Sequence, residues 1–267
     1  MDKKSIGIIG GGFVGSAIKK YYDKGKYSVK VYDKFKDSDS IEDVIKQNYI
    51  FIAVPTPFAD GKIDLGPMDD AMKNASKAKK GTIVVIKSTV IPGTTENYQK
   101  QYLDLKILFN PEFLTESTAD QDFQFPDTQV IGYTKQSYDV AGEVQEILPL
   151  APFNRIIPAT EAEVVKYFRN TWYATKVIFA NQIYDLCQKI GVDYDLVRES
   201  AGADRRMTGQ SHLDVAYGGY RGYGGKCLPK DLRALVAFAD SQGVDLALLK
   251  KAEEINQKLT GGEDKTI

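Results

Sequence analysis

The chain has 267 residues, of which 43% are apolar and 27% charged, and its 35 basic and 36 acidic residues give a formal net charge of −1. This is the size and composition of a folded protein with one large domain or two modest ones. The balanced charge argues against a nucleic-acid partner, and the apolar runs are too short to span a membrane. With two cysteines, one histidine and no recognisable secretion signal, we expect a cytoplasmic protein with reduced thiols and no metal.

The first expected element is a short strand, Ser5–Ile9, that enters a glycine-rich turn. The turn has the pattern G-x-G-x-x-G, formed by Gly10, Gly12 and Gly15. A helix that starts with Phe13 and Val14 follows, and a second strand, Ser28–Tyr32, ends at Asp33. Strand, turn, helix, strand and acid in this order are typical of a dinucleotide-binding fold.

Each part of this pattern has a physical role. The first glycine allows a tight turn, the second allows a pyrophosphate to approach the backbone, and the third allows helix and strand to pack closely. The helix N-terminus offers unpaired N–H groups to the phosphates. Asp33 can accept hydrogen bonds from ribose hydroxyls and would repel a 2′-phosphate, so the predicted cofactor is NAD rather than NADP.

Further strands and helices alternate along the first half of the chain, which predicts a parallel, doubly wound sheet. Strands are expected at Tyr49–Val54, Thr82–Lys87, Lys106–Phe109 and Gln129–Tyr133, and a helix at Gly66–Lys77. Ligands of such sheets bind at the carboxyl ends of the strands. The polar residues that follow these ends are Thr56, Ser88, Thr89, Asn110 and Glu112.

The second half opens with a long helical pattern from Thr160 to Lys189, preceded by Pro158. Thr160 and Glu163 have the spacing of a capping box at its start. A helix this long connects parts of a chain or lies in a dimer interface. Lys166 and Asn170 share one of its faces, and their spacing leaves two readings open: a shared ligand or a solvated surface.

A glycine-rich segment then leads into Cys227, Pro229 and a helix that extends to about Ser241. Cys227 is therefore predicted at a helix N-terminus, and Lys226 and Lys230 flank it, an environment that stabilises a thiolate. The alternative is a small apolar residue in a turn. Cys187 falls among apolar helix positions and is predicted to be core, and His212 is predicted to be a surface or loop-ordering residue.

Several segments, in order, make the sequence similar to the UDP-glucose/GDP-mannose dehydrogenase family. They are Gly10–Gly15, Val54–Pro57, Lys87–Val90, Asn110–Glu116, Phe125–Asp127, Glu161–Asn170, Arg206 and Gly222–Asp231. The resemblance implies a four-electron oxidation of a nucleotide sugar's C6 alcohol to a carboxylate, favouring UDP-glucose, for polysaccharide biosynthesis. Two NAD are consumed, and Cys227 carries a thiohemiacetal and then a thioester.

The resemblance also implies roles for individual residues. Lys166 and Asn170 would stabilise an oxyanion, Glu112 would be the base in thioester hydrolysis, and Thr89 with Asp231 would hold a catalytic water. The remaining NAD contacts implied are Thr56, Thr89, Glu116 and Lys230. The substrate contacts implied are Phe113, Leu114, Lys166, Asn170, Arg206, Tyr220, Gly222, Tyr223, Gly224 and Gly225, with Arg206 acting in its own or in a partner subunit's site.

The expected architecture is α/β: a doubly wound Rossmann-type NAD-binding domain, residues 1–158, followed by an all-helical central domain, residues 159–267, with a long connecting helix and a role in a homodimer. Two departures from the family pattern are Ser117 for glycine and Thr128 for arginine. The family's C-terminal domain, which closes over the nucleotide sugar, is expected to be absent. This leaves open an NAD-binding, dimer-forming module without turnover, a dehydrogenase for UDP-N-acetylmannosamine or GDP-mannose, and a two-electron hydroxyacid dehydrogenase.

Overall fold

The computed structural model describes residues 4–24, 27–204, 212–215 and 219–265. The chain divides into two compact units, one formed by Met1–Ala59 with Ile63–Lys166 and the other by Asp60–Lys62 with Tyr167–Ile267. The predicted domain boundary at residue 158 stays a prediction.

The first unit is built on a seven-stranded sheet with the order β2-β1-β3-β6-β7-β8-β9. Its strands are β1 (Ser5–Ile9), β2 (Ser28–Tyr32), β3 (Tyr49–Ile52), β6 (Ile83–Ile86), β7 (Lys106–Phe109), β8 (Thr128–Tyr133) and β9 (Phe153–Pro158). The short strands β4 (Phe58–Ala59) and β5 (Lys62–Ile63) form a separate pair. Because β2 and β3 lie on opposite sides of β1, the chain changes direction there, and ligands of open α/β sheets bind at such a point.

The sheet departs from the all-parallel arrangement predicted, since β8 runs antiparallel to β7. A parallel pair would have required the chain to cross back to the opposite edge of the sheet. The antiparallel pair instead lets residues 110–127 stay beside the edge where β7 ends. The strand β9, which pairs in parallel with β8, was not predicted, because its exposed residues lack the apolar pattern of the other strands.

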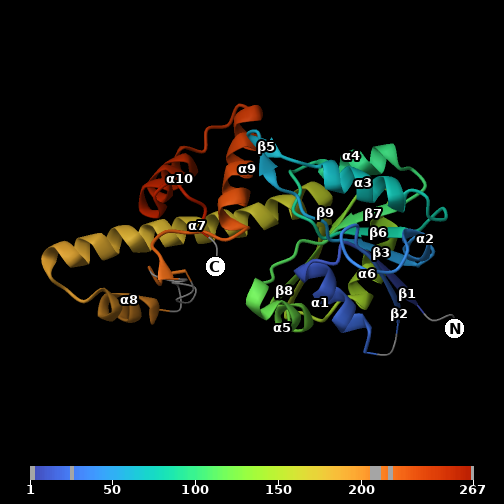
Figure 1. The fold of residues 1–267 in the computed structure, drawn as a ribbon, viewed down its shortest axis with the longest axis horizontal. Coiled ribbons are helices and arrows are strands. Elements are labelled where there is room, and N and C mark those ends of the chain that lie inside the picture. The colour runs from blue at the N-terminus through green and yellow to red at the C-terminus, as the bar shows by residue number, and fades with distance from the viewer. Residues whose placement is uncertain (1–3, 25–26, 205–211, 216–218, 266–267) are drawn as a thin grey trace. The chain divides into compact units, whose positions relative to one another are not determined.

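Helices cover both faces of this sheet, as expected for a doubly wound fold (Figure 1). One buried cluster joins alternate strand residues, such as Ile8 and Phe51, to helices α1, α5 and α6. The other joins Ile50 and Val84 to α2, α3, α4 and the start of α7. These helices are α1 (Phe13–Tyr22), α2 (Ile41–Val44), α3 (Gly66–Ala75), α4 (Thr94–Gln101), α5 (Ala119–Gln124) and α6 (Ala141–Ile147), with short 3₁₀ turns at Glu116–Thr118 and Tyr138–Val140.

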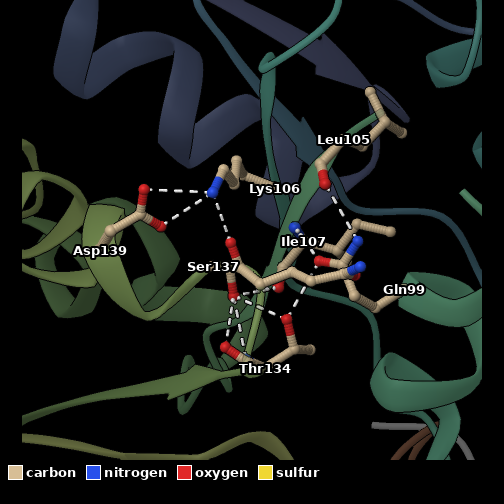
Figure 2. A network of polar contacts seen from close by, with 8 residues as sticks. Gln99, Leu105, Lys106, Ile107, Thr134, Ser137 and Asp139 are labelled. Atoms are coloured by element: carbon tan, nitrogen blue, oxygen red, sulfur yellow. Dashed lines mark hydrogen bonds and ion pairs between the residues drawn. The ribbon is translucent and has the colours of Figure 1, made fainter. Parts of the chain in front are cut away.

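Side chains complete the hydrogen bonding of β7 where its pairing with β8 stops (Figure 2). The ladder pairs only Leu108 and Phe109 with β8. The Ile107 N–H instead donates to Gln99 Oε1 at 2.9 Å, and its carbonyl accepts from Ser137 Oγ at 2.7 Å. Gln99 lies on α4, so this buried network fixes the C-terminal end of that helix to the sheet.

The described elements of the second unit are helical apart from the residues contributed by 60–62. They are α7 (Ala159–Ile190), which begins in the first unit, α8 (Tyr194–Gly202), α9 (Leu228–Ser241) and α10 (Ala247–Thr260). The 32 residues of α7 correspond to about 48 Å of helix. One apolar cluster packs α7 against α9 and α10, and another, which includes the buried Cys187, packs α7 against α8. The predicted core position of Cys187 is confirmed.

The capping box predicted for α7 is wrong. The helix begins at Ala159, one residue before Thr160. The Glu163 carboxylate accepts hydrogen bonds from Gly93 and Thr95, at the start of α4, rather than returning to its own helix. The sequence signal could not distinguish the two helices, because both need acceptors for their first N–H groups.

The glycine turn gives a test of the fold. Gly10 has φ +104°, and a Cβ there would overlap the Ala53 carbonyl at the end of β3. We expect Gly10→Ala to cost at least about 2 kcal/mol and to lower the thermal midpoint by about 4–8 °C. Gly12 has φ −71° and open space where an alanine methyl group would lie. Gly12→Ala should therefore leave the midpoint unchanged, and equal midpoints for both variants would contradict this account.

Candidate functional site

The glycine turn has the shape that a dinucleotide requires. A Cβ on Gly15 would overlap the Gly10 carbonyl oxygen, so only glycine allows α1 to pack this closely on β1. Gly12 is the N-cap of α1, and no heavy atom lies within 4 Å of the position of a Cβ. Phe13 and Val14 open the helix and pack their side chains against the core. The turn thus presents backbone N–H groups to an open face, which fits a pyrophosphate.

Asp33 lies just past β2 and also holds the glycine turn. Its Oδ2 accepts a hydrogen bond from the Gly11 N–H at 2.7 Å, and its Oδ1 accepts from the Phe35 N–H at 2.9 Å. The Lys36 ammonium donates to the Gly11 carbonyl at 2.5 Å. Each carboxylate oxygen retains a further lone pair for a ribose hydroxyl.

The predicted residues at the ends of β3 and β6 lie together. The Thr56 hydroxyl donates to the Thr89 carbonyl at 2.7 Å. Ser88 Oγ donates to the Val54 carbonyl at 2.8 Å and accepts from the Val54 N–H at 2.9 Å. These bonds join the two strand ends that follow the switch point of the sheet.

Lys166 and Glu112 form a buried ion pair, so the solvated reading of Lys166 is wrong. The Lys166 Nζ lies 2.8 Å from Glu112 Oε1 and 2.8 Å from the Glu112 carbonyl oxygen, and both residues are at most 7% exposed. Glu112 Oε2 accepts from the Leu114 N–H at 2.8 Å, and the Phe113 ring centroid lies 5.9 Å from the Lys166 Nζ. Local spacing did not reveal this burial, since the partner is 54 residues away.

A second buried lysine shares this environment. Lys87 donates to Asn110 Oδ1 at 2.7 Å, and burial, with the charge of Lys166, lowers its pKa to about 7 despite the attraction of Glu112. Burial favours the neutral form of Glu112, but Lys166, the Leu114 N–H and Lys87 outweigh it and keep the Glu112 pKa below its ordinary value. Glu112 is therefore ionised at neutral pH.

In the second unit, Cys227 is the N-cap of α9, with Pro229 in the first turn, as predicted. The Asp231 N–H donates to the Cys227 carbonyl at 2.8 Å. The fully buried Asp231 carboxylate accepts hydrogen bonds from the Asn170 amide and from Lys230 Nζ, the latter at 2.5 Å. The structure thus brings Asn170 of α7 to Lys230 and Asp231, which lie in the first turn of α9 after the cysteine, and Asn170 is buried rather than solvated.

The glycine loop before Cys227 is held by α10. The Asn256 side chain accepts from the Tyr223 N–H at 2.7 Å and donates to the Tyr223 carbonyl at 3.0 Å. A Cβ on Gly222 would lie 2.5 Å from Asn256 Oδ1, and one on Gly224 would overlap the Tyr220 hydroxyl. The Gly225 N–H donates to the Lys265 carbonyl at 2.7 Å. Three of the predicted sugar-binding glycines therefore lie in a tightly held loop.

The roles of two other predicted site residues, Glu116 and Arg206, stay predictions. Glu116 is exposed in a short 3₁₀ turn, and Arg206 lies outside the described residues. His212 stacks on Tyr173 with ring centroids 4.4 Å apart. Sequence reasoning assigned no role to Lys87, Asn256 or Glu163 in the site. The signal available for Lys87 was a lysine at the end of an otherwise apolar strand.

Two kinds of feature are absent from the described residues: a cluster of metal ligands and a membrane-spanning helix. No group of three or more histidine, cysteine, aspartate or glutamate side chains there could hold a metal ion. No helix in the same part of the chain is long and apolar enough to cross a membrane.

Two segments of the chain match one family of dehydrogenases. Residues 26–148 match the NAD binding domain of the UDP-glucose/GDP-mannose dehydrogenase family, and residues 160–258 match its central domain. Together with the glycine turn and the α/β fold, these matches define the class: a chain with the NAD-binding and central domains of a dehydrogenase family. The chain belongs to the UDP-glucose/GDP-mannose dehydrogenase family.

Individual relatives agree with this assignment. The chain is 37% identical over 243 residues to the UDP-glucose 6-dehydrogenase AglM of Haloferax volcanii, covering 84% of this chain and 55% of that protein. It is 37% identical over 227 residues to the UDP-glucose 6-dehydrogenase of Pseudomonas aeruginosa, covering 78% and 48%. The solved UDP-glucose dehydrogenase of Pyrobaculum islandicum has a TM-score of 0.84 at 29% identity, covering 96% of this chain and 68% of that one. The chain thus spans about half the length of the curated relatives.

The buried ion pair gives a test of the site. Lys166→Met leaves the Glu112 carboxylate buried without its main partner, and we expect it to lower the free energy of urea unfolding by about 3–5 kcal/mol. The double variant Lys166→Met with Glu112→Gln should recover part of this loss. The control is Lys20→Met, which breaks an exposed pair with Asp120 and should cost at most about 1 kcal/mol. Equal losses for Lys166→Met and Lys20→Met would contradict the account.

Proposed function

We propose that the chain oxidises the C6 alcohol of a nucleotide sugar to a carboxylate with NAD, and that UDP-glucose is the favoured substrate. The observation that carries this proposal is the position of Cys227 at the start of α9, one turn before the buried Asp231. The relatives named UDP-glucose 6-dehydrogenases support the choice of sugar.

The cysteine accounts for an oxidation that goes beyond the aldehyde. One sugar alcohol, one water and two NAD⁺ give one carboxylate, two NADH and three protons. After the first hydride leaves C6, the Cys227 thiolate adds to the aldehyde and forms a thiohemiacetal, and loss of a second hydride gives a thioester. Water then attacks the thioester, the carbon–sulfur bond breaks, and the thiolate is restored. The N-terminal end of α9 favours the thiolate.

Lys166 and Asn170 would stabilise the negative oxygen on C6. In the state described, Lys166 is held by Glu112, and Asn170 by Asp231. When Lys166 turns to the substrate oxygen, Glu112 loses a hydrogen bond to its charged form and becomes a stronger base. Glu112 can then accept the proton of the attacking water, whose position Thr89 and Asp231 would set.

The residues that would hold NAD are Gly10, Gly12, Phe13, Val14, Gly15, Asp33, Thr56, Thr89, Glu116 and Lys230. NAD, when bound, accepts the hydride in each oxidation. The glycine turn would bind its pyrophosphate and Asp33 its adenosine ribose, as their open face and acceptor oxygens allow. The reaction requires that NAD and Cys227 reach the same carbon in turn.

The nucleotide sugar would bind along the glycine loop. Its contacts are proposed to be Phe113, Leu114, Lys166, Asn170, Arg206, Tyr220, Gly222, Tyr223, Gly224 and Gly225. The closely held backbone around Gly222 and Gly224 leaves no room for side chains, and such backbone suits close contact with a ligand.

We place the protein in the cytoplasm, where reduced thiols are stable, because neither cysteine is in a disulfide. We place its product in polysaccharide biosynthesis.

Substrate turnover tests the cysteine mechanism. With UDP-glucose and NAD, the chain should form two NADH per sugar consumed, followed by the absorbance of NADH. Cys227→Ser should lower carboxylate formation by roughly 10²-fold or more, because no thioester can form. Cys187→Ala, which changes the buried core cysteine, should keep the activity.

Two results would contradict this proposal. Full carboxylate formation by Cys227→Ser would indicate that no thioester is needed. Absence of NADH with UDP-glucose, UDP-N-acetylmannosamine and GDP-mannose would leave an NAD-binding module without turnover.

We also propose a homodimer formed through α7. Five large apolar side chains on this helix are 51–72% exposed: Phe168, Trp172, Phe179, Leu186 and Ile190. Their spacings of four and seven residues place them on one side of the helix. A continuous exposed stripe of this kind marks an interface, and a second copy can cover it through a twofold axis, since each copy presents the same stripe.

Charged substitutions in the stripe test the dimer. Trp172→Glu with Phe179→Glu should convert a dimer to a monomer, as measured by light scattering during size-exclusion chromatography, because a buried unpaired carboxylate is costly. Leu150→Glu changes an exposed leucine of the first unit and should leave the mass unchanged. A monomeric wild-type chain, or a dimeric double variant, would overturn the proposal.

A further inference from the structure

Glu163 is a fully buried carboxylate that none of the roles above uses. It lies in the first turns of α7, three residues before Lys166. Its Oε2 accepts from the Gly93 N–H at 2.5 Å, and its Oε1 accepts from the Thr95 N–H at 2.8 Å and the Thr95 hydroxyl at 2.6 Å. All three donors belong to the start of α4, so one side chain supplies the acceptors for that helix end.

No side chain at the start of α4 caps the first N–H groups of that helix. The N-cap of α4 is Gly93, with φ +92°, and it has no side chain to cap the helix. The first N–H groups of a helix need acceptors when they are buried. Glu163 therefore replaces the missing local cap from a helix that lies 70 residues further along the chain.

Residues 87–93 precede α4, and we call this segment the Thr89 loop. Its first end follows β6 and is held by Thr56, which donates to the Thr89 carbonyl at 2.7 Å. Its second end is Gly93, held by Glu163. The far end of α4 is fixed to β7 by Gln99 (Figure 2). The Thr89 loop is thus held at both ends, and Glu163 is its link to α7.

We propose that Glu163 is a positioning residue that fixes the Thr89 loop against the helix segment that carries Lys166. Because Glu163 and Lys166 lie one turn apart, a shift of α4 relative to α7 would also change the distance between Thr89 and the Lys166–Glu112 pair. The role of Thr89 rests on the proposed function, whereas the anchoring of the loop does not.

The ionisation of Glu163 offers a readout that general destabilisation would not produce. Burial raises its pKa to about 7, although the three donors favour the charged form, and the nearby charge of Glu96 on α4 adds to the increase. Between the ordinary glutamate pKa and about 7, the folded state binds more protons than the unfolded one, so this contribution to stability is lost as pH rises through that window. Opening of the start of α4 brings Glu163 into contact with water, so the same linkage favours this local opening as pH rises.

The test compares the full chain with Glu163→Gln between about pH 6 and pH 8.5, on either side of the Glu163 pKa. Glutamine keeps the shape but has one acceptor oxygen, and its NH₂ group faces a donor. At the acid end, where Glu163 is largely neutral, amide hydrogen exchange in residues 88–98 should be about tenfold faster in Glu163→Gln, because its NH₂ group leaves the partly buried Gly93 N–H without an acceptor. In the wild type this exchange, corrected for its intrinsic pH dependence, should become faster as pH rises through about 7, because opening of the loop lets Glu163 ionise in water. This pH dependence should be absent in the variant.

Glu161→Gln is the matched control, since Glu161 is an exposed glutamate in the same turn of α7, and it should behave as the wild type. Unchanged exchange in residues 88–98 of Glu163→Gln would overturn the anchor. Faster exchange with wild-type NAD affinity, kcat and KM would overturn the positioning role. If the wild type fails to turn over any nucleotide sugar, the proposed function fails, while the exchange measurement still tests the anchor by itself.

Discussion

The burial of two lysines beside one glutamate is the constraint on which the first unit depends. Removing an ammonium from water is costly unless an acceptor replaces the lost hydration. Glu112 and the Glu112 carbonyl do this for Lys166, and Asn110 does it for Lys87. These acceptors lie just past the end of β7, so the strand, the segment that follows it and the start of α7 must be placed together. The antiparallel pairing of β8 contributes by keeping residues 110–127 at this edge of the sheet.

In the second unit, too, a buried charge is compensated by polar side chains. Asp231 is fully buried and tolerable there because Asn170 and Lys230 donate to it. Asn256 holds the Tyr223 backbone through both its donor and its acceptor, as a neighbouring strand would. In each unit, therefore, polar side chains from distant parts of the chain fix the backbone near the candidate site. Such networks are rigid when every member is satisfied.

Local patterns predicted the features that local chemistry decides. The glycine turn, the strand that precedes it and the cysteine at the start of α9 each depend on residues close together in sequence, and each was found as predicted. The burial of Lys166 and Asn170 depends on partners 54 and 61 residues away, so helical spacing alone left it open, and only the family resemblance favoured it. The role of Glu163 could not be predicted from its neighbours, because its carboxylate oxygens serve another helix. The antiparallel direction of β8 was also not predicted, since the sequence pattern of a strand does not indicate its direction in the sheet.

The double use of Asp33 limits how the cofactor preference of this chain could be redesigned. The same carboxylate that would bind a ribose holds the Gly11 and Phe35 N–H groups. Replacing it with a neutral or basic residue to admit a 2′-phosphate would therefore also remove the acceptors of two backbone N–H groups and loosen the turn that would bind the pyrophosphate. A change of cofactor would need a second substitution that restores an acceptor for Gly11. Specificity and the shape of the binding turn are thus coupled through one side chain, and they would have to evolve together.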